Sequence, residues 1–399
     1  MAIRPYRSRL FVTPTTSAST ASRTGLPAGT PRVLFACGGT GGHVYPAIAI
    51  ADAVRRLRPD AAVAFAGTRD RMEWEAVPKA GYPIRAITVS GFQRGLSASA
   101  IARNLTFPFK LVKGLWESWR LVGSFDPDVV VGTGGYASGP VGLAASLRGR
   151  PLVLQEQNAY AGATNKLLSG RADKVFLAFE AAVPYFDGAE TAISGNPVRQ
   201  DLLDVDAAEA RAHFDLLADA RVLLAMGGSL GAGPLNGALK LHLDALLADE
   251  RTVVIWAAGK RYYDTLRAAV PDHPRLRLVP YLDRMDLAYA AADLALCRSG
   301  AITCSELAVT GTPSVLVPSP NVTADHQTKN ALALSEAGAA VLLPEPDLAS
   351  QFEAVVVPLL HDPAARQSMT EAALAIARPE AATTIAEAVV ALADAAPTR

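Results

Sequence analysis

Short apolar runs alternate with longer stretches of helical periodicity from residue 32 onward. Strands that are apolar throughout and are separated by helices are typical of a parallel sheet with helices on both faces. In the first half we predict strands over Arg32–Ala36, Ala62–Ala66, Ile84–Val89, Val129–Val131, Leu152–Gln155, Val175–Ala178 and Thr191–Ser194. The helices between them are predicted over Ala47–Leu57, Trp74–Ala80 and Gly139–Leu147.

The same alternation then starts again. The second set of strands is predicted over Arg221–Met226, Thr252–Ala257, Arg275–Val279, Leu294–Cys297 and Ser314–Val317. The helices that accompany them are predicted over Pro234–Leu247, Arg261–Val270, Met285–Ala292, Cys304–Thr310 and Gln327–Ala337. The predicted fold class is therefore α/β, with two doubly wound, Rossmann-like domains that face a cleft.

The domain boundaries follow from breaks in this pattern. We place the first domain at 31–195 and the second at 196–378, with the turn Gly195–Arg199 as the linker. The Ala-rich tail, at about 379–395, is predicted to be a helix that returns to the first domain. Residues 1–30 carry Arg, Ser and Thr but no acid, and we interpret them as a disordered N-terminal extension. An organelle transit peptide has a similar composition.

Composition removes several classes of function. The formal net charge is zero, which argues against nucleic acid as a partner. The chain has no Cys-x-x-Cys pair, so Cys37, Cys297 and Cys304 are interpreted as reduced core residues of a cytoplasmic protein. No apolar run is long enough to span a bilayer.

Three glycine-rich turns each follow a predicted strand and precede a segment that can start a helix. They are Gly38–His43, Gly132–Tyr136 and Gly227–Ala232. A strand that leads into such a turn brings backbone N–H groups and a helix N-terminus to one point, where phosphate oxygens bind well. Three of them predict more than one phosphorylated ligand. None has the dinucleotide Gly-x-Gly-x-x-Gly spacing, and no acid ends the next strand, which argues against NAD.

Polar residues that follow the strands of the first half are candidates for chemistry. Thr40 and the N–H groups of Gly39–Gly42 are predicted to hold a pyrophosphate, with His43 beside it as base or hydrogen-bond donor. A structural histidine is the alternative. Tyr136 and Ser138 are candidates for orienting a sugar or peptide. The stretch Gln155–Asn158, together with Asn165, follows a buried strand and is predicted to be part of a site, with loop capping as the alternative.

The second half offers a similar set. Ser229 lies in the third turn, and Arg298 follows a strand, where its planar guanidinium suits a diphosphate or braces the site. Glu306 opens the next helix, where a carboxylate can accept both hydroxyls of a ribose; a helix-dipole partner is the alternative. The stretch Asp325–Gln327 is a candidate for reading sugar hydroxyls. No metal-binding pattern occurs, and Asp204–Asp206 is interpreted as the start of a helix.

A stretch between Gly91 and Val122 combines apolar and basic side chains. It contains Leu105, Phe107, Phe109, Lys110, Lys113 and Trp116, with a single acid, Glu117. Such a mixture suits the face of an anionic membrane. A buried amphipathic helix with a basic, solvated side is the alternative.

The motifs together resemble the MurG family of GT-B glycosyltransferases. The resemblance covers residues 31 to 375 and rests on stretches that occur in the family's order: GGTGGHVYPA, GTGGYASGP, QEQNAYAGATNKLL, SGNPVR, GGSLGA, CRSGAITCSE and DHQTKN. One glycine loop is a weak signal, but seven motifs in series are specific. The N-terminal arm is longer than the family pattern.

The resemblance implies an activity. It is the inverting transfer of N-acetylglucosamine from UDP-N-acetylglucosamine to the C4 hydroxyl of undecaprenyl-pyrophosphoryl-N-acetylmuramyl-pentapeptide (lipid I), which gives lipid II in peptidoglycan synthesis. The expected catalytic bases are His43 first and Glu156 second, with no metal or other cofactor. The expected place is the cytoplasmic side of the bacterial cell membrane, as a peripheral protein that can meet other cell-wall and division proteins.

The resemblance also assigns the two substrates. In the second domain, Glu306 would hold the ribose, Ser229 the diphosphate and the backbone of Leu282 the uracil. Arg298 would brace the nucleotide, and His326 and Gln327 would read the sugar. Further donor-binding residues would be Thr40, Gly41, Gly42, Asn158 and Arg199. The acceptor would meet the first two glycine loops, with His43, Tyr136 and Asn165 around it.

Three alternatives stay open at this point. A UDP-N-acetylglucosamine 2-epimerase shares the fold but needs neither a lipid contact nor an acceptor. A non-catalytic UDP-sugar-binding protein would bind without turnover. A transferase for another lipid or natural product is a third, against which the QEQN and DHQTKN stretches argue.

Overall fold

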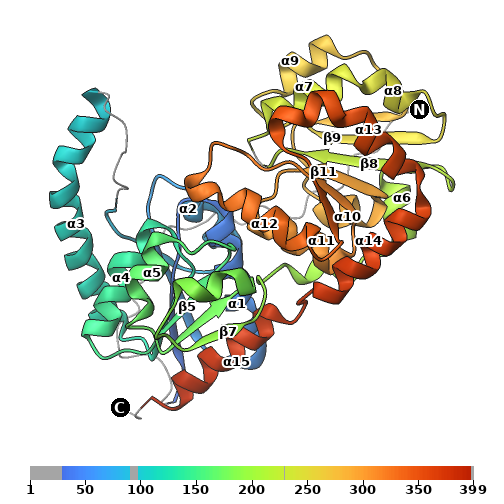
Figure 1. The fold of residues 1–399 in the computed structure, drawn as a ribbon. Helices are drawn as coiled ribbons and strands as arrows, with labels where there is room; N and C mark the ends of the chain where they lie inside the picture. Colours follow the sequence, from blue (N-terminus) through green and yellow to red (C-terminus); the bar gives the residue numbers. More distant parts are fainter. Residues whose placement is uncertain (1–28, 90–97, 229, 397–399) are drawn as a thin grey trace, which may run out of the picture.

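The computed structural model describes residues 29–89, 98–228 and 230–396 of the chain. The predicted extension at 1–30 therefore lies almost wholly outside the described residues. Two α/β domains stand side by side, each built on a parallel sheet with helices on both faces (Figure 1). Among the described residues, no helix is both long and apolar enough to cross a membrane.

The first sheet has seven strands in the order β3-β2-β1-β4-β5-β6-β7. Alternate residues of each strand face opposite sides, so Val33 and Phe35 of β1 enter one core and Leu34 and Ala36 enter the other. The strands are β1 Arg32–Ala36, β2 Ala62–Gly67, β3 Ile84–Ala86, β4 Val129–Gly132, β5 Leu152–Glu156, β6 Lys174–Leu177 and β7 Thr191–Ile193. The helices are α1 Gly41–Leu57, α2 Glu73–Lys79, α3 Ala98–Phe125, α4 Gly135–Leu147, α5 Ala163–Ser169 and the 3₁₀ turn η1 Glu180–Tyr185.

The second sheet has six parallel strands in the order β10-β9-β8-β11-β12-β13. They are β8 Arg221–Met226, β9 Thr252–Ala257, β10 Leu276–Val279, β11 Leu294–Cys297, β12 Ser314–Leu316 and β13 Ala340–Leu342. The α-helices are α6 Ala207–His213, α7 Gly233–Leu241, α8 Leu243–Leu247, α9 Tyr263–Ala269, α10 Met285–Ala291, α11 Ala301–Thr310, α12 His326–Ser335, α13 Leu348–His361, α14 Pro363–Ile376 and α15 Ala381–Asp394. Short 3₁₀ turns are η2 Gln200–Leu202, η3 Thr323–Asp325 and η4 Glu345–Asp347.

The last helix, α15, leaves the second domain and packs on α1 of the first (Figure 1). Its buried residues Ile385 and Val389 share one apolar cluster with Phe35 and Ile50. The predicted return of the C-terminal helix is confirmed.

Several element boundaries differ from the prediction. Helix α1 begins at Gly41 rather than Ala47, because the glycine turn itself supplies its first turn. The helix predicted over Pro234–Leu247 is two helices, α7 and α8, which are separated at His242 by a non-helical residue with φ −105° and ψ 13°. Strand β13 was not predicted from the sequence.

Two local interpretations are confirmed. Asp206 caps α6 by accepting a hydrogen bond from the N–H of Ala208 at 2.9 Å, so the Asp204–Asp206 stretch does start a helix. The three cysteines are buried and unpaired, and burial raises the pKa of Cys297 to about 12.

Candidate active site between the two domains

The first glycine turn presents an open helix N-terminus. Thr40 occupies the N-cap of α1 in an extended conformation, and its side chain is exposed and makes no capping hydrogen bond. Within the described part of the chain, nothing accepts from the N–H groups of Thr40, Gly41 and Gly42. These donors, at the positive end of a long helix, can bind phosphate oxygens.

A buried carboxylate, Glu73, holds this turn from behind. It is fully buried and accepts from the N–H of Gly39 at 3.1 Å, the N–H of Thr68 at 3.0 Å and the hydroxyl of Thr68 at 2.6 Å. A Cβ on Gly38 would lie 2.8 Å from its Oε1, so glycine is required there. The sequence analysis missed Glu73, because an acid in the first turn of a helix is common and carries no functional signal.

The second turn packs directly on the first. Gly135 has a φ of 77°, and a Cβ there would lie 2.1 Å from the carbonyl oxygen of Gly38. Ser138 is fully buried, and its hydroxyl lies 2.6 Å from the carbonyl oxygen of Ala36 and 2.7 Å from that of Gly134. The expectation that Ser138 orients a substrate is wrong, because its hydroxyl is committed to the two turns. Tyr136, in contrast, is 55% exposed.

His43 lies where these two turns meet. Its Nδ1 is 3.0 Å from the carbonyl oxygen of Thr133 and 2.8 Å from Oε1 of Gln157. The Thr133 hydroxyl in turn donates to the carbonyl oxygen of His43 at 2.8 Å. Since both groups at Nδ1 are acceptors, Nδ1 carries the proton and Nε2 has a free lone pair. Among the described residues, none is hydrogen-bonded to that Nε2.

Glu156, the second candidate for the base, is saturated with hydrogen bonds. Its carboxylate is 1% exposed and accepts from the N–H and side chain of Asn158, the N–H of Gly162 at 2.9 Å and the side chain of Asn165 at 2.9 Å. Such a group organises the loop after β5, and it is less available to a substrate than Nε2 of His43.

Asn158 and Asn165 come together around this carboxylate but have different surroundings. Asn165 is 2% exposed, and its buried Oδ1 has no hydrogen-bond partner among the described residues. Asn158 reaches the second domain, where its Oδ1 accepts from Asn330 at 3.4 Å. Asn330 is fully buried and also accepts from the N–H of Ala159 at 3.0 Å. The asparagine of the DHQTKN stretch therefore joins the two domains.

Glu306 lies on α11, on the second domain's side of the interface. Its Oε2 accepts from the hydroxyl of Tyr289 at 2.9 Å. Burial raises the pKa of Glu306 to about 7, against the opposing effects of Tyr289 and of the Arg199 charge. A half-buried carboxylate whose Oε1 has no hydrogen bond from any described residue suits the hydroxyls of a ribose.

The other predicted donor residues lie in three different settings. Arg199 lines a cavity of about 520 Å³ between the domains, together with Tyr45 and Tyr281. Leu282, the residue after Tyr281, is buried, and within the described residues no group hydrogen-bonds to its main chain. Arg298 donates to the carbonyl oxygens of Val317 and Pro318 and pairs with Glu345.

The guanidinium of Arg298 therefore stabilises the loop after β12, which contains Val317 and Pro318. Gln327 belongs to the same region, because its Oε1 accepts from the N–H of Ser319 at 2.8 Å. His326 and Gln327 begin α12, which Figure 1 shows between the two sheets. Ser229 lies outside the described residues. Its neighbour Gly231, with φ 75°, packs closely on the carbonyl of Ala258.

An apolar stripe runs along α3, at the edge of the first domain farthest from the second (Figure 1). Phe109 is 79% exposed and Trp116 is 56% exposed, and with Val112 they lie on one helical face. Lys113 flanks this face, and Lys110 is half-buried. The opposite face packs on the domain through Gly114 and Ser118. The side chains of Leu105 and Phe107 lie outside the described residues.

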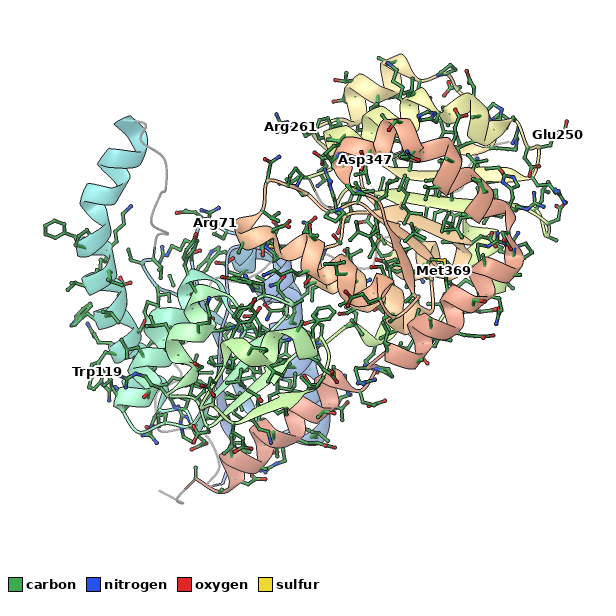
Figure 2. The ribbon with its side chains drawn as sticks, viewed as in Figure 1. Arg71, Trp119, Glu250, Arg261, Asp347 and Met369 are labelled. Carbon is green, nitrogen blue, oxygen red and sulfur yellow. The ribbon has the colours of Figure 1, made fainter. Side chains whose placement is uncertain are left out.

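The exposure of Phe109, Val112 and Trp116 contradicts the alternative of a buried amphipathic helix with a basic, solvated side. Trp119, labelled in Figure 2, lies farther along the helix, where the Arg148 guanidinium covers its ring at 4.0 Å.

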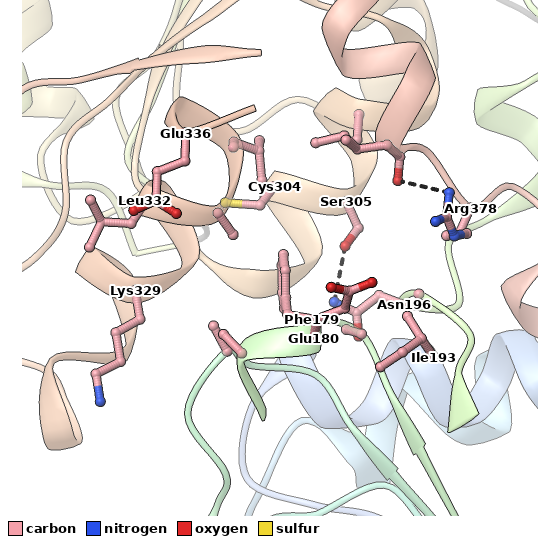
Figure 3. Close-up of a pocket in the computed structure, with 18 of the residues that line it drawn as sticks. Phe179, Glu180, Ile193, Asn196, Cys304, Ser305, Lys329, Leu332, Glu336 and Arg378 are labelled. Atoms are coloured by element: carbon pink, nitrogen blue, oxygen red, sulfur yellow. Dashed lines mark hydrogen bonds between the residues drawn. The ribbon is translucent and has the colours of Figure 1, made fainter. Parts of the chain in front are cut away.

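A second cavity between the domains has a volume of about 650 Å³ (Figure 3). The first domain contributes Phe179 and Glu180, and α11 and α12 of the second contribute Ser305 and Lys329. His43, Glu306 and Gln327 are not among its lining residues. This cavity is a separate space between the domains, bordered by Asn196. Within the described ranges, no group of three or more His, Cys, Asp or Glu side chains is placed to hold a metal ion.

Comparisons with known proteins agree with this architecture. The Glycosyltransferase family 28 N-terminal domain matches residues 33–177, and the Glycosyltransferase family 28 C-terminal domain matches residues 222–388. The chain is 58% identical over 364 residues to the UDP-N-acetylglucosamine--N-acetylmuramyl-(pentapeptide) pyrophosphoryl-undecaprenol N-acetylglucosamine transferase of Salinibacter ruber. That alignment covers 91% of this chain and 97% of the relative.

Two solved structures have similar folds to this chain but differ in how closely their sequences match it. The crystal structure of Acinetobacter baumannii MurG has a TM-score of 0.71 and 30% identity, and the match covers 90% of this chain and 99% of that one. A putative UDP-N-acetylglucosamine 2-epimerase from Listeria monocytogenes has a TM-score of 0.65 at 16% identity, covering 89% and 94% of the two chains, and shows the shared fold alone.

The two facing domains and the paired glycine turns define a GT-B glycosyltransferase. The chain belongs to glycosyltransferase family 28 and, within it, to the MurG family.

Proposed function

We propose that this protein transfers N-acetylglucosamine from UDP-N-acetylglucosamine to the C4 hydroxyl of lipid I, and so makes lipid II for peptidoglycan synthesis. The names of the relatives describe this transfer, and the chain spans nearly their whole length. The observation in the structure that carries the proposal is the free Nε2 of His43, at the junction of two phosphate-binding turns.

His43 is the proposed general base. Nε2 takes the proton from the acceptor hydroxyl, whose oxygen then bonds to the anomeric carbon of the donor. The bond from that carbon to the UDP oxygen breaks, and its electron pair leaves with UDP. Attack from the face opposite the leaving group inverts the anomeric centre. A histidine suits this proton transfer because its ordinary pKa lies near neutral pH.

The second domain is proposed to hold the donor. Glu306 accepts the ribose hydroxyls, the main chain of Leu282 pairs with the uracil, and Ser229 with the third glycine turn binds the diphosphate. Gln327 and His326 lie at the N-terminus of α12 and read the sugar. Backbone N–H groups stabilise the charge that develops on the leaving diphosphate, so no divalent cation is required.

The first domain is proposed to meet the acceptor, with Tyr136 and Asn165 near the muramyl group. The free N–H groups of Thr40, Gly41 and Gly42 are proposed to bind pyrophosphate oxygens. Asn158 and Arg199 are proposed to contact the donor from the same side of the cleft. The apolar stripe of α3, with its lysines, supports a peripheral contact with the cytoplasmic side of the membrane, where an undecaprenyl acceptor would reside. Other cell-wall and division proteins would be reached at that surface.

The decisive experiment measures UDP release and lipid II formation with UDP-N-acetylglucosamine, in the presence and absence of lipid I. Lipid II that forms only with lipid I supports the proposal. Conversion of the donor to its 2-epimer without acceptor would instead establish the epimerase. Binding without any turnover would establish a UDP-sugar-binding protein.

A further inference from the structure

Three buried amide side chains link His43 to the second domain. Gln157, Gln155 and Asn196 are 1%, 0% and 2% exposed. The mechanism above uses none of them. Because a buried amide has distinct donor and acceptor ends, the partners of each determine which way it points.

Gln157 is the amide in contact with His43. Its nitrogen Nε2 donates to the carbonyl oxygens of Thr133 at 2.7 Å and Gln155 at 3.0 Å, and to Oε1 of Gln155. All three partners are acceptors. A reversed amide would direct its oxygen at three oxygens, so Oε1 must face Nδ1 of His43.

Gln155 and Asn196 are oriented in the same way. Nε2 of Gln155 donates to Oδ1 of Asn196 at 2.9 Å and to the carbonyl oxygen of Glu156 at 3.3 Å. Nδ2 of Asn196 donates to the carbonyl oxygens of Gln157 and Ala301 at 2.9 and 3.3 Å. It also lies 3.0 Å from Oγ of Ser305, a contact that Figure 3 shows.

The series ends on the helix that carries Glu306. Ala301 and Ser305 both belong to α11, in the second domain. The three amides are therefore bonded in series, from α11 through Asn196, Gln155 and Gln157 to Nδ1 of His43.

We propose that Asn196, Gln155 and Gln157 are positioning residues which hold the proton of His43 on Nδ1 and so keep Nε2 ready to accept a proton. This inference rests on the proposed role of His43 as the base. It adds a dependence on the domain arrangement, because movement of α11 away from the first domain would remove the contacts of Asn196 with Ala301 and Ser305. Thr133 also accepts from Nδ1, so loss of the amides weakens this preference without abolishing it.

The direct test is the tautomer of His43 in the full-length protein. Long-range ¹H–¹⁵N spectra of histidine-labelled protein distinguish a proton on Nδ1 from one on Nε2, and the variant His43→Gln identifies the resonances. We expect Nδ1–H in the unaltered protein and a mixture of both tautomers in Gln157→Leu and Gln155→Leu. An unchanged tautomer in both variants would overturn the proposal.

Kinetics supply a second readout. Gln157→Leu should lower kcat about tenfold while the KM for UDP-N-acetylglucosamine stays within about twofold, because the amide acts through His43 and not on the donor. A rise in KM with unchanged kcat would count against it. If Gln157→Leu does not fold, Gln155→Leu can be measured in its place, because Gln155 contacts Gln157 and not His43 itself.

Asn236→Leu is the matched control. Asn236 is a buried amide that bonds to Trp256 and Ala258 inside the second domain, away from His43. Its loss should lower thermal stability and leave the His43 resonances unchanged. If His43→Ala keeps full turnover, the base assignment fails, while the spectra still decide whether the amides set the tautomer.

Discussion

The hydroxyl of Tyr289 donates to Oε2 of Glu306 at 2.9 Å, and so fixes one oxygen of this half-buried carboxylate. The phenol reaches α11 from the neighbouring helix α10, where Tyr289 is buried. One carboxylate oxygen is thus held by the protein, and the other is left for a ligand.

The pH dependence of donor binding tests this arrangement. The pKa of Glu306 is raised to about 7, and a ribose hydroxyl donates best to the ionised form. The affinity for UDP-N-acetylglucosamine should therefore rise roughly tenfold between pH 6 and pH 8, as the ionised fraction grows. Isothermal titration calorimetry measures it, with the nucleotide sugar as probe because free UDP titrates in the same range.

The variant Glu306→Gln removes the titration. Its donor affinity should be lower than that of the unaltered protein at pH 8 and flat between pH 6 and pH 8. The raised pKa means that the folded state binds this proton more tightly than the unfolded state, so the stabilising contribution is present below pH 4.5 and lost as pH rises through 7. Glu306→Gln should consequently be no less stable than the unaltered protein at pH 8.

Removing the proposed base should separate chemistry from binding. His43→Ala should lower kcat by about 10²- to 10⁴-fold, because a positioned base contributes that much, and leave the affinity for UDP-N-acetylglucosamine close to normal. Single-turnover formation of lipid II measures the chemical step. Equal turnover in the variant would remove His43 from this role and leave Glu156 as the remaining candidate.

The stripe on α3 should bind anionic vesicles. Replacing Phe109, Val112 and Trp116 with serine should weaken partitioning into vesicles of phosphatidylglycerol and phosphatidylethanolamine by at least about tenfold, because each exposed apolar side chain contributes about 1–3 kcal/mol when it enters the interface. Vesicle co-sedimentation measures the loss.

A double replacement of Leu217 and Leu241 with serine is the control for that experiment. Both are exposed leucines of the second domain, 74% and 67% accessible, and lie outside α3. Partitioning that falls equally in both sets of variants would show that α3 has no special role.

Loss of the buried carboxylate behind the first turn should destabilise the first domain. Glu73→Ala leaves the N–H groups of Gly39 and Thr68 without their acceptor, which costs about 3 kcal/mol in the free energy of unfolding. Glu75→Ala changes an exposed acid of the same helix and should alter it by less than about 0.5 kcal/mol. Urea unfolding followed by circular dichroism compares the two, and equal effects would contradict the assignment.

Donor binding should need no divalent cation. Treatment with EDTA should leave the affinity for UDP-N-acetylglucosamine unchanged, because backbone N–H groups take the place of a metal at the diphosphate. A large loss that magnesium restores would contradict this prediction.

The starts of several strands could be predicted from the sequence, but not all of their ends. The strands that begin at Arg32, Ala62 and Arg221 begin where they were predicted, because each is apolar after its first residue and is bounded by a polar or glycine turn. The short run at Ile84 was predicted too long, because pairing with β2 ends at Ala86. Periodicity does not record where a partner strand stops.

The residues proposed to contact the substrates could be predicted from the sequence. The buried residues that hold them in place could not. His43 and Glu306 stand next to recognisable motifs, so their type and place identify them. Glu73, Asn196 and Asn330 act through partners that are distant in the chain: Asn330 bonds to Ala159, and Asn196 bonds to Ser305. Gln155 was predicted to belong to a site, but its bond to Asn196 was not predictable, because the two residues lie far apart in the chain.

The placement of α15 has a consequence for how the polypeptide reaches its native state. The helix that completes the interior around Phe35 and Ile50 is synthesised after every strand of the other domain. The apolar side of α1 therefore stays uncovered during synthesis until α15 has been made. Truncation of α15 would therefore destabilise the first domain, although α15 follows the second domain in the sequence.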